Sequence, residues 1–85
     1  MYRIVFAKEA QRTLLRLPRN TAILIREKLQ LLALDPYAPN SNIKKLQNRP
    51  GYRLRVGDWR IIYEIQHDVL AILVIKIAKR GEVYR

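Results

Sequence analysis

The chain has 85 residues, which predicts one domain, residues 1–85, with a single hydrophobic core. It has no cysteine and one histidine, His67, which excludes disulfides, cysteine-based zinc sites, thiol nucleophiles and two-histidine metal sites within one chain. The formal net charge of +10 implies an anionic partner, whether a nucleic acid, an acidic protein or a membrane surface. Basic residues are spread along the chain without a basic tail, and this favours a folded anion site over a flexible arm.

The N-terminus leads directly into a strand-like pattern instead of an apolar signal segment. The longest apolar run, residues 69–75, is too short to span a membrane. We therefore expect a cytoplasmic protein without a membrane segment.

The spacing of the apolar residues changes within the first sixteen or so residues. Residues 2–6 alternate between apolar and other side chains, which is typical of a strand. From Ala7 the apolar spacing becomes helical, and Pro18 ends this helix near Arg16 or Leu17.

A second helix is expected from a cap at Asn20 or Thr21 to about Leu34. Its apolar residues form two stripes, wider than one packing face requires. The first stripe is expected to cover a sheet, and the second to contact the preceding helix, with part of it open to a partner protein. The first stripe is Ala22, Ile25, Leu29 and Leu32, and the second is Leu24, Leu31 and Leu34.

The region after this helix is rich in proline, asparagine and serine, so residues 35–42 are predicted to form a loop. Residues 43–46 are compatible with a short helical turn or an extended arm. Residues 48–51 read as a turn that leads into the next element.

Residues 52–63, YRLRVGDWRIIY, have the pattern of a β-hairpin whose two-residue turn is Gly57-Asp58, in type II′ geometry. Counting outward from the turn pairs Arg55 with Arg60 and places Arg53 opposite Ile62. Like charges directly opposite each other destabilise a strand pair, so this face suggests a polyanion site in which guanidiniums hold phosphate oxygens. The other face is predicted to be core: Tyr52, Leu54, Val56, Trp59, Ile61 and Tyr63.

The strand is expected to continue through Ile65, turn near His67-Asp68 and return as a central strand over residues 69–78. If residues 71, 73, 75 and 77 face the helices, Lys76 and Arg80 join the arginine side. The predicted fold is α+β: an N-terminal strand, a helical hairpin and a three-stranded antiparallel meander, in one antiparallel sheet packed on the helices (β-α-α-β-β-β).

Three segments of the sequence, taken together with this order of elements, are similar to those of a known protein family. They are the stretch YRLRVGDWRIIYEI, the upstream Lys45-Leu46 and the ending KRGEVY at residues 79–84. Together with the element order they resemble the RelE/ParE superfamily of toxins from bacterial and archaeal type II toxin–antitoxin pairs. The resemblance covers essentially the whole chain.

The resemblance implies one of two activities. RelE-like members are ribosome-dependent endoribonucleases that enter the A site and cut mRNA by attack of a ribose 2′-OH on the adjacent phosphate. ParE-like members share the fold, lack the nuclease residues and poison DNA gyrase. A third reading is an inactive toxin that serves as co-repressor with its antitoxin. No cofactor or metal is implied.

Carried over by motif, the catalytic positions of RelE-like toxins fall on Arg53, Arg55, Arg60, Arg80 and Tyr84. We assign RNA binding to Lys44, Lys45, Arg49, Lys76 and Lys79. Some members use a Glu and a His for acid–base chemistry, but here no His lies near the C-terminus. Arginine is a poor general base, so the proton acceptor stays open among Tyr84, Glu64 and Lys79.

The implied partners are a cognate acidic antitoxin, the ribosome and its mRNA. The toxin–antitoxin complex is expected to be oligomeric and to bind DNA through the antitoxin. The antitoxin is expected to wrap the toxin as an amphipathic helix or an added strand.

Overall fold

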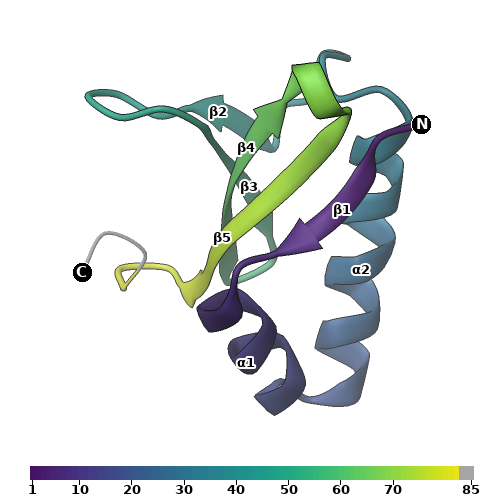
Figure 1. Ribbon diagram of the computed structural model, residues 1–85. Coiled ribbons are helices and arrows are strands. Elements are labelled where there is room, and N and C mark those ends of the chain that lie inside the picture. The colour runs from purple at the N-terminus through teal and green to yellow at the C-terminus, as the bar shows by residue number, and fades with distance from the viewer. Residues whose placement is uncertain (83–85) are drawn as a thin grey trace.

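The computed structural model describes residues 1–82 and consists of two layers, with two helices packed on one face of a five-stranded sheet (Figure 1). This confirms the predicted α+β class and the order of a strand, two helices and then strands. The elements are β1 (Arg3–Phe6), α1 (Lys8–Arg16), α2 (Arg19–Leu34), β2 (Ile43–Lys45), β3 (Tyr52–Val56), β4 (Trp59–Gln66), a 3₁₀ turn (His67–Val69) and β5 (Ala71–Lys79). No helix within residues 1–82 is long and apolar enough to cross a lipid bilayer.

The sheet is mixed, not antiparallel throughout as predicted. Its strand order is β1-β5-β4-β3-β2, and β1 runs parallel to β5 while the other neighbours are antiparallel. Tight turns force the β3–β4 pair to be antiparallel. The strand β1 is joined to the rest only through the helices, so no turn constrains its direction. As predicted, β5 is an interior strand.

The hairpin register matches the prediction at every position, from Val56 opposite Trp59 to Tyr52 opposite Tyr63. Gly57, the first residue of the turn, has φ +58. Asp58, the second, does not have a positive φ, since the described residues other than glycine with positive φ are Asn48 and Leu70. A positive φ at the first turn residue alone is the signature of type II′. Residues 43–45 form the edge strand β2, which decides between the two readings of this segment.

The start of α2 differs from the prediction. The helix begins at Arg19 with Pro18 as its N-cap, and no side chain caps it. The Pro18 carbonyl accepts the first intrahelical bond, from the Ala22 N–H at 3.0 Å. Proline is tolerated in a first helical turn because its missing N–H would have no partner there. Pro18 therefore separates the helices and also starts the second.

The predicted contact between the second apolar stripe of α2 and α1 is wrong. Ile25, Leu29 and Leu32 of the first stripe are buried, whereas Leu24, Leu31 and Leu34 are 42%, 62% and 64% exposed. The reason is that α1 packs on β5 and β1, while α2 packs on β1 and β3. The outer side of α2 therefore faces outward instead of the other helix.

A bulge divides β5 into two halves with different facing. Ile62 lies opposite Lys76 but the next residue, Tyr63, lies opposite Val74, so Ile75 is an extra residue in β5. Ile77 therefore joins the main core on the helix side, as do Val74 and Ile72 beyond the bulge. The condition that residues 71, 73, 75 and 77 all face the helices is therefore not met, and Lys76 nevertheless lies opposite Ile62 on the arginine side.

Candidate functional site

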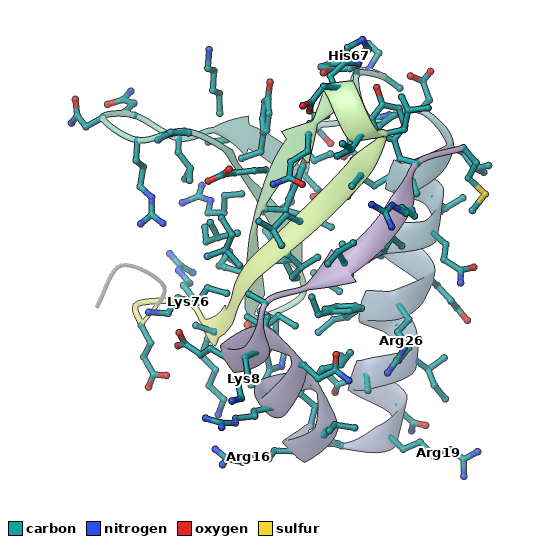
Figure 2. All side chains as sticks on the ribbon, in the orientation of Figure 1. Lys8, Arg16, Arg19, Arg26, His67 and Lys76 are labelled. Atoms are coloured by element: carbon teal, nitrogen blue, oxygen red, sulfur yellow. The ribbon has the colours of Figure 1, made fainter. Side chains whose placement is uncertain are left out.

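The face of the sheet turned away from the helices carries the basic residues of the hairpin. Lys44, Arg53, Ile62 and Lys76 lie opposite one another on four adjacent strands and form a row across the sheet. At about 4.8 Å per strand, the row spans roughly 14 Å between its two lysines. Figure 2 shows Lys76 on the side of β5 away from α2.

A second row lies two residues closer to the hairpin turn. It consists of Arg55, Arg60 and Ala78. Arg80 follows beyond the end of β5, where its backbone N–H donates to the Asp58 carbonyl at 2.8 Å. We call the surface formed by Arg53, Arg55, Arg60 and Arg80 the arginine face.

Arg60 is the residue on which these charges act most strongly. It is half-buried, and its burial together with the positive charges of Arg53, Arg80 and Arg55 lowers the pKa of its guanidinium from the ordinary arginine value. Its Nη1 donates to the carbonyls of Gly57 at 2.8 Å and Trp59 at 3.0 Å. Both contacts use Nη1, so within the described residues Nε and Nη2 are available to an anion.

Arg55 is held by a residue that sequence reasoning missed. The Asn42 side-chain oxygen accepts from Arg55 Nη2 at 2.8 Å and from Nε at 3.2 Å, and the Asn42 carbonyl accepts from the Arg55 N–H at 2.8 Å. Asn42 lies directly before β2, so its role depends on the pairing of β2 with β3. Extending the hairpin pattern to a third strand was the only sequence signal for it.

The floor of the arginine face is apolar, which sequence reasoning also missed. Leu46, Ile62 and Ala78 are buried there as a second cluster, with Ile75 packed against them. An apolar floor lowers the local dielectric, so it disfavours isolated charge and strengthens a guanidinium–anion contact. The run Ile61-Ile62, which interrupts the alternation of β4, was the signal in the sequence.

The face opens at the hairpin turn into a hollow of about 530 Å³. Arg55, Arg60 and Arg80 line it on the sheet side, and Leu24 and Lys28 of α2 line it on the other. It is an open depression lined by three guanidiniums, each of which can donate paired hydrogen bonds to an anion.

The other predicted residues do not belong to the rows of the arginine face, although Lys45 lines a hollow together with Lys44 and Arg53. Lys45 lies opposite Tyr52 and Lys79 opposite Trp59, on the alternate face, and Lys79 Nζ lies 5.9 Å from the Trp59 ring centre. Arg49 is exposed in the loop between β2 and β3. Their roles in RNA binding stay predictions.

The candidate proton acceptors also differ in placement. Glu64 lies four residues from Arg60 on β4, roughly 13 Å along the strand. Lys79 belongs to the Trp59 side, and Tyr84 lies outside the described residues. Within residues 1–82, no group of three or more His, Cys, Asp or Glu side chains is placed to hold a metal ion.

The family model described as "ParE toxin of type II toxin-antitoxin system, parDE" matches residues 4–84. The chain belongs to this family of toxins. No curated protein sequence gives a match. The family assignment confirms the resemblance to RelE/ParE toxins.

Solved structures agree with the family assignment. The chain is similar to a chain of the archaeal RelE–RelB complex from Pyrococcus horikoshii OT3, at 27% identity over 96% of this chain and 98% of that one, with a TM-score of 0.80. The intact E. coli RelBE toxin–antitoxin complex matches at 20% identity, 96% and 100% coverage and a TM-score of 0.81. The YoeB/ParE toxin from Agrobacterium tumefaciens matches at 13% identity, 92% and 98% coverage and a TM-score of 0.78. The last two show the fold alone.

Proposed function

We propose that this toxin is a cytoplasmic, ribosome-dependent endoribonuclease that cuts mRNA in the A site and so inhibits translation. The observation that supports the proposal is the arginine face, where Arg53, Arg55 and Arg60 converge with Arg80 over an apolar floor. Such an arrangement has little use in stabilising the fold, because Arg55 and Arg60 oppose each other directly.

The chemistry follows from these charges. The ribose 2′-oxygen forms a bond to the adjacent phosphorus, and the bond to the 5′-oxygen of the next nucleotide breaks. The 2′ proton passes to a base, and the departing 5′-oxygen takes up a proton. Arg60 and Arg80 stabilise the added negative charge of the phosphorane-like transition state by donating hydrogen bonds to it, and the contacts of Arg60 with the Gly57 and Trp59 carbonyls preorganise it for this role.

In vitro translation with the purified protein, followed by mapping of mRNA 5′ ends, tests the proposal. Cuts in phase with codons, which require ribosomes, are expected. Arg60→Ala serves as the matched inactive control. Intact mRNA at toxin concentrations that block translation would refute the nuclease activity.

The alternative activity is inhibition of DNA gyrase without nuclease action. It is favoured by the name of the matching family model, which is ParE rather than RelE. A gyrase supercoiling assay separates the two, because stalled gyrase–DNA complexes together with intact mRNA would establish the alternative. Failure of both assays would favour the inactive co-repressor.

The antitoxin partner is proposed to dock on the outer stripe of α2. Leu24, Leu31 and Leu34 are exposed there on a strongly basic protein, which suits an acidic amphipathic helix. Leu31→Lys with Leu34→Lys should prevent recovery of a complex with the antitoxin encoded beside the toxin. Leu15→Lys on α1, where the leucine is 71% exposed, is the matched control. Equal recovery from both variants would exclude this surface.

A further inference from the structure

Asn42 has one polar group that the fold does not use. Its backbone N–H donates to the Asn40 side-chain oxygen at 2.8 Å, and its backbone carbonyl accepts from the Arg55 N–H at 2.8 Å. Its side-chain Oδ1 accepts from Nη2 and Nε of Arg55 at 2.8 Å and 3.2 Å. Among residues 1–82, these hydrogen bonds occupy every polar group of Asn42 except the amide nitrogen, Nδ2.

The chemistry of Arg55 decides which way this amide is oriented. A guanidinium carries hydrogen-bond donors only, so the Asn42 atom that faces Arg55 must be the carbonyl oxygen. A flipped amide would place its own donors against those of the guanidinium. The NH₂ group of Asn42 therefore lies on the side of the amide away from Arg55, and the bonds to Arg55 hold it there before any ligand arrives.

The hollow at the hairpin turn has a lining that suits a nucleotide. Asn42 lines it together with four cations and one carboxylate, so the hollow favours an anion. Leu24, which is 42% exposed, and Val56 add an apolar wall. A nucleotide has both an anionic phosphate and a flat, largely apolar base, and proteins read unstacked RNA bases by hydrogen bonds to their edges. The charged side chains of the lining are Lys28, Arg55, Arg60, Arg80 and Asp58.

An NH₂ group without its partner oxygen discriminates among the four bases. An asparagine that reads adenine uses both its oxygen and its nitrogen, but here Arg55 occupies the oxygen. Guanine and uracil present a keto oxygen, which accepts, where adenine and cytosine present an amino group, which donates. Two donors that face each other are both left without a partner. The free amide nitrogen of Asn42 therefore favours a keto base.

We propose that Asn42 is a specificity-determining residue, whose Nδ2 donates to the keto oxygen of a guanine or uracil beside the phosphate held at the arginine face. The base lies against Leu24, and the same Asn42 side chain orients Arg55 through its oxygen. Asn42 thus connects recognition of the base to placement of a guanidinium. The inference rests on the proposed function in taking the ligand to be mRNA.

Asn42→Asp tests the inference because the two side chains have the same shape. Aspartate keeps an oxygen for Arg55 but replaces the NH₂ donor by a second acceptor, so the preference should move to adenine and cytosine. Asn40→Asp is the matched control. It adds the same negative charge two residues away, it keeps the oxygen that accepts from the Asn42 N–H, and Asn40 does not line the hollow at the hairpin turn.

Two measurements give the base preference. Cleavage rates are compared on programmed ribosomes with each of the four bases in turn on either side of the cut. Affinities are compared for four short single-stranded RNAs that differ in one base and carry 2′-O-methyl groups, which prevent cleavage. The wild-type protein should favour guanine and uracil by roughly 3- to 10-fold, as expected for one hydrogen bond. Asn40→Asp should keep this ratio, and Asn42→Asp should reverse it. A uniform loss of affinity from the added negative charge leaves the ratios unchanged.

The outcomes distinguish this inference from the proposed activity. If the wild-type protein never cuts mRNA but its relative affinities for the four RNAs depend on Asn42, the nuclease proposal fails and the base contact stands. An unchanged preference in Asn42→Asp, or an equal shift in Asn40→Asp, would overturn the inference. A wild-type protein that binds and cuts all four RNAs equally would overturn it as well.

Discussion

Arg60 is the residue most closely tied to the proposed chemistry. The carbonyls of Gly57 and Trp59 fix its guanidinium through Nη1, and among residues 1–82 its Nε and Nη2 have no hydrogen-bond partner. We expect Arg60→Ala to lower the cleavage rate by roughly 10²–10³, as for loss of a preorganised donor to a developing charge. Ribosome binding should weaken far less. Pre-steady-state cleavage on programmed ribosomes measures the rate.

Arg60→Lys separates charge from geometry in the same assay. An ammonium keeps the charge but cannot reproduce the two-pronged contact of a guanidinium, so activity should stay well below wild type. Arg3→Ala, on β1, is the control. Wild-type cleavage by Arg60→Ala would refute the assignment.

Tyr84 is the candidate base whose test discriminates most, since Glu64 and Lys79 are displaced from Arg60. Tyr84→Phe should reduce the cleavage rate by roughly 10²–10⁴ if the hydroxyl transfers a proton. If the Tyr84 ring instead stacks on a nucleobase of the mRNA, Phe keeps that contact and the rate should be retained. Glu64→Gln is the parallel variant and should retain activity. Full activity of both Tyr84→Phe and Tyr84→Ala, measured with end-labelled mRNA, would eliminate Tyr84 from the mechanism.

The buried hydroxyl of Tyr63 lowers the stability of the fold. Its side chain is fully buried, its ring stacks on Tyr52 with centres 5.6 Å apart, and within the described residues its hydroxyl has no hydrogen-bond partner. A buried hydroxyl without a partner is destabilising. Tyr63→Phe should therefore raise the free energy of unfolding by about 1 kcal/mol, measured by urea denaturation near neutral pH. A loss of more than about 1 kcal/mol would show that the hydroxyl is bonded.

The same residue predicts a pH dependence. Burial, and secondly Tyr52, raise the pKa of Tyr63 well above its ordinary value of 10.0. Below pH 10 the hydroxyl is neutral in both the folded and the unfolded chain, so its ionisation takes nothing from the free energy of unfolding. Above pH 10 the unfolded chain loses this proton while the folded chain keeps it, so stability falls by about 1.4 kcal/mol per pH unit. Tyr63→Phe should lack this part of the alkaline loss.

At the level of elements, two glycines set the hairpins that carry the site. Gly51 has φ +106, and a Cβ there would lie 2.6 Å from the Tyr63 carbonyl oxygen. Gly57 has φ +58 with open space around it. Gly57→Ala should cost about 1 kcal/mol from backbone strain alone, whereas Gly51→Ala should cost at least about 3 kcal/mol because a backbone atom must also move. Thermal unfolding of the two variants checks the order, and equal costs would contradict it.

The β3–β4 hairpin was predictable because local rules determine it. The Gly57-Asp58 turn fixes the pairing, and the period of two then assigns each side chain to a face. The bulge at Ile75 was not predictable in this way, because both sides of β5 are apolar and alternation gives no parity. The parallel placement of β1 and the exposure of the second α2 stripe depend on how distant elements pack, which no local pattern encodes.

The candidate site divides along the same line. The hairpin pattern alone predicted the places of Arg53, Arg55 and Arg60. The place of Lys76 followed from assuming strict alternation along β5, which the bulge at Ile75 interrupts. The role of Asn42 and the apolar floor required the pairing of β2 with β3 and the fold of Leu46 back over the sheet. The sequence thus predicted the positions of the arginines, but it did not predict that Asn42 orients Arg55 or that apolar residues lie beneath the arginine face.

At the level of the whole molecule, the charge is divided between the two layers. The sheet layer carries the arginine face with Lys44 and Lys76, and the helical layer carries exposed basic residues of α1 at Lys8, Arg12 and Arg16. A protein of this charge should bind ribosomes mainly by releasing counterions from RNA. If about five phosphates are contacted, log K should fall against log salt with a slope near −3 to −5.

Lys44 and Lys45 allow this expectation to be tested within one strand. They are neighbours on β2, but Lys44 pairs with Arg53 on the arginine face and Lys45 pairs with Tyr52 on the other. Lys44→Ala should reduce the salt slope by about one unit and leave cleavage at saturation intact. Lys45→Ala removes the same charge and should have the smaller effect. Equal reductions would mean that net charge alone governs binding, and a slope near zero for the wild-type protein would remove the electrostatic argument for the whole surface.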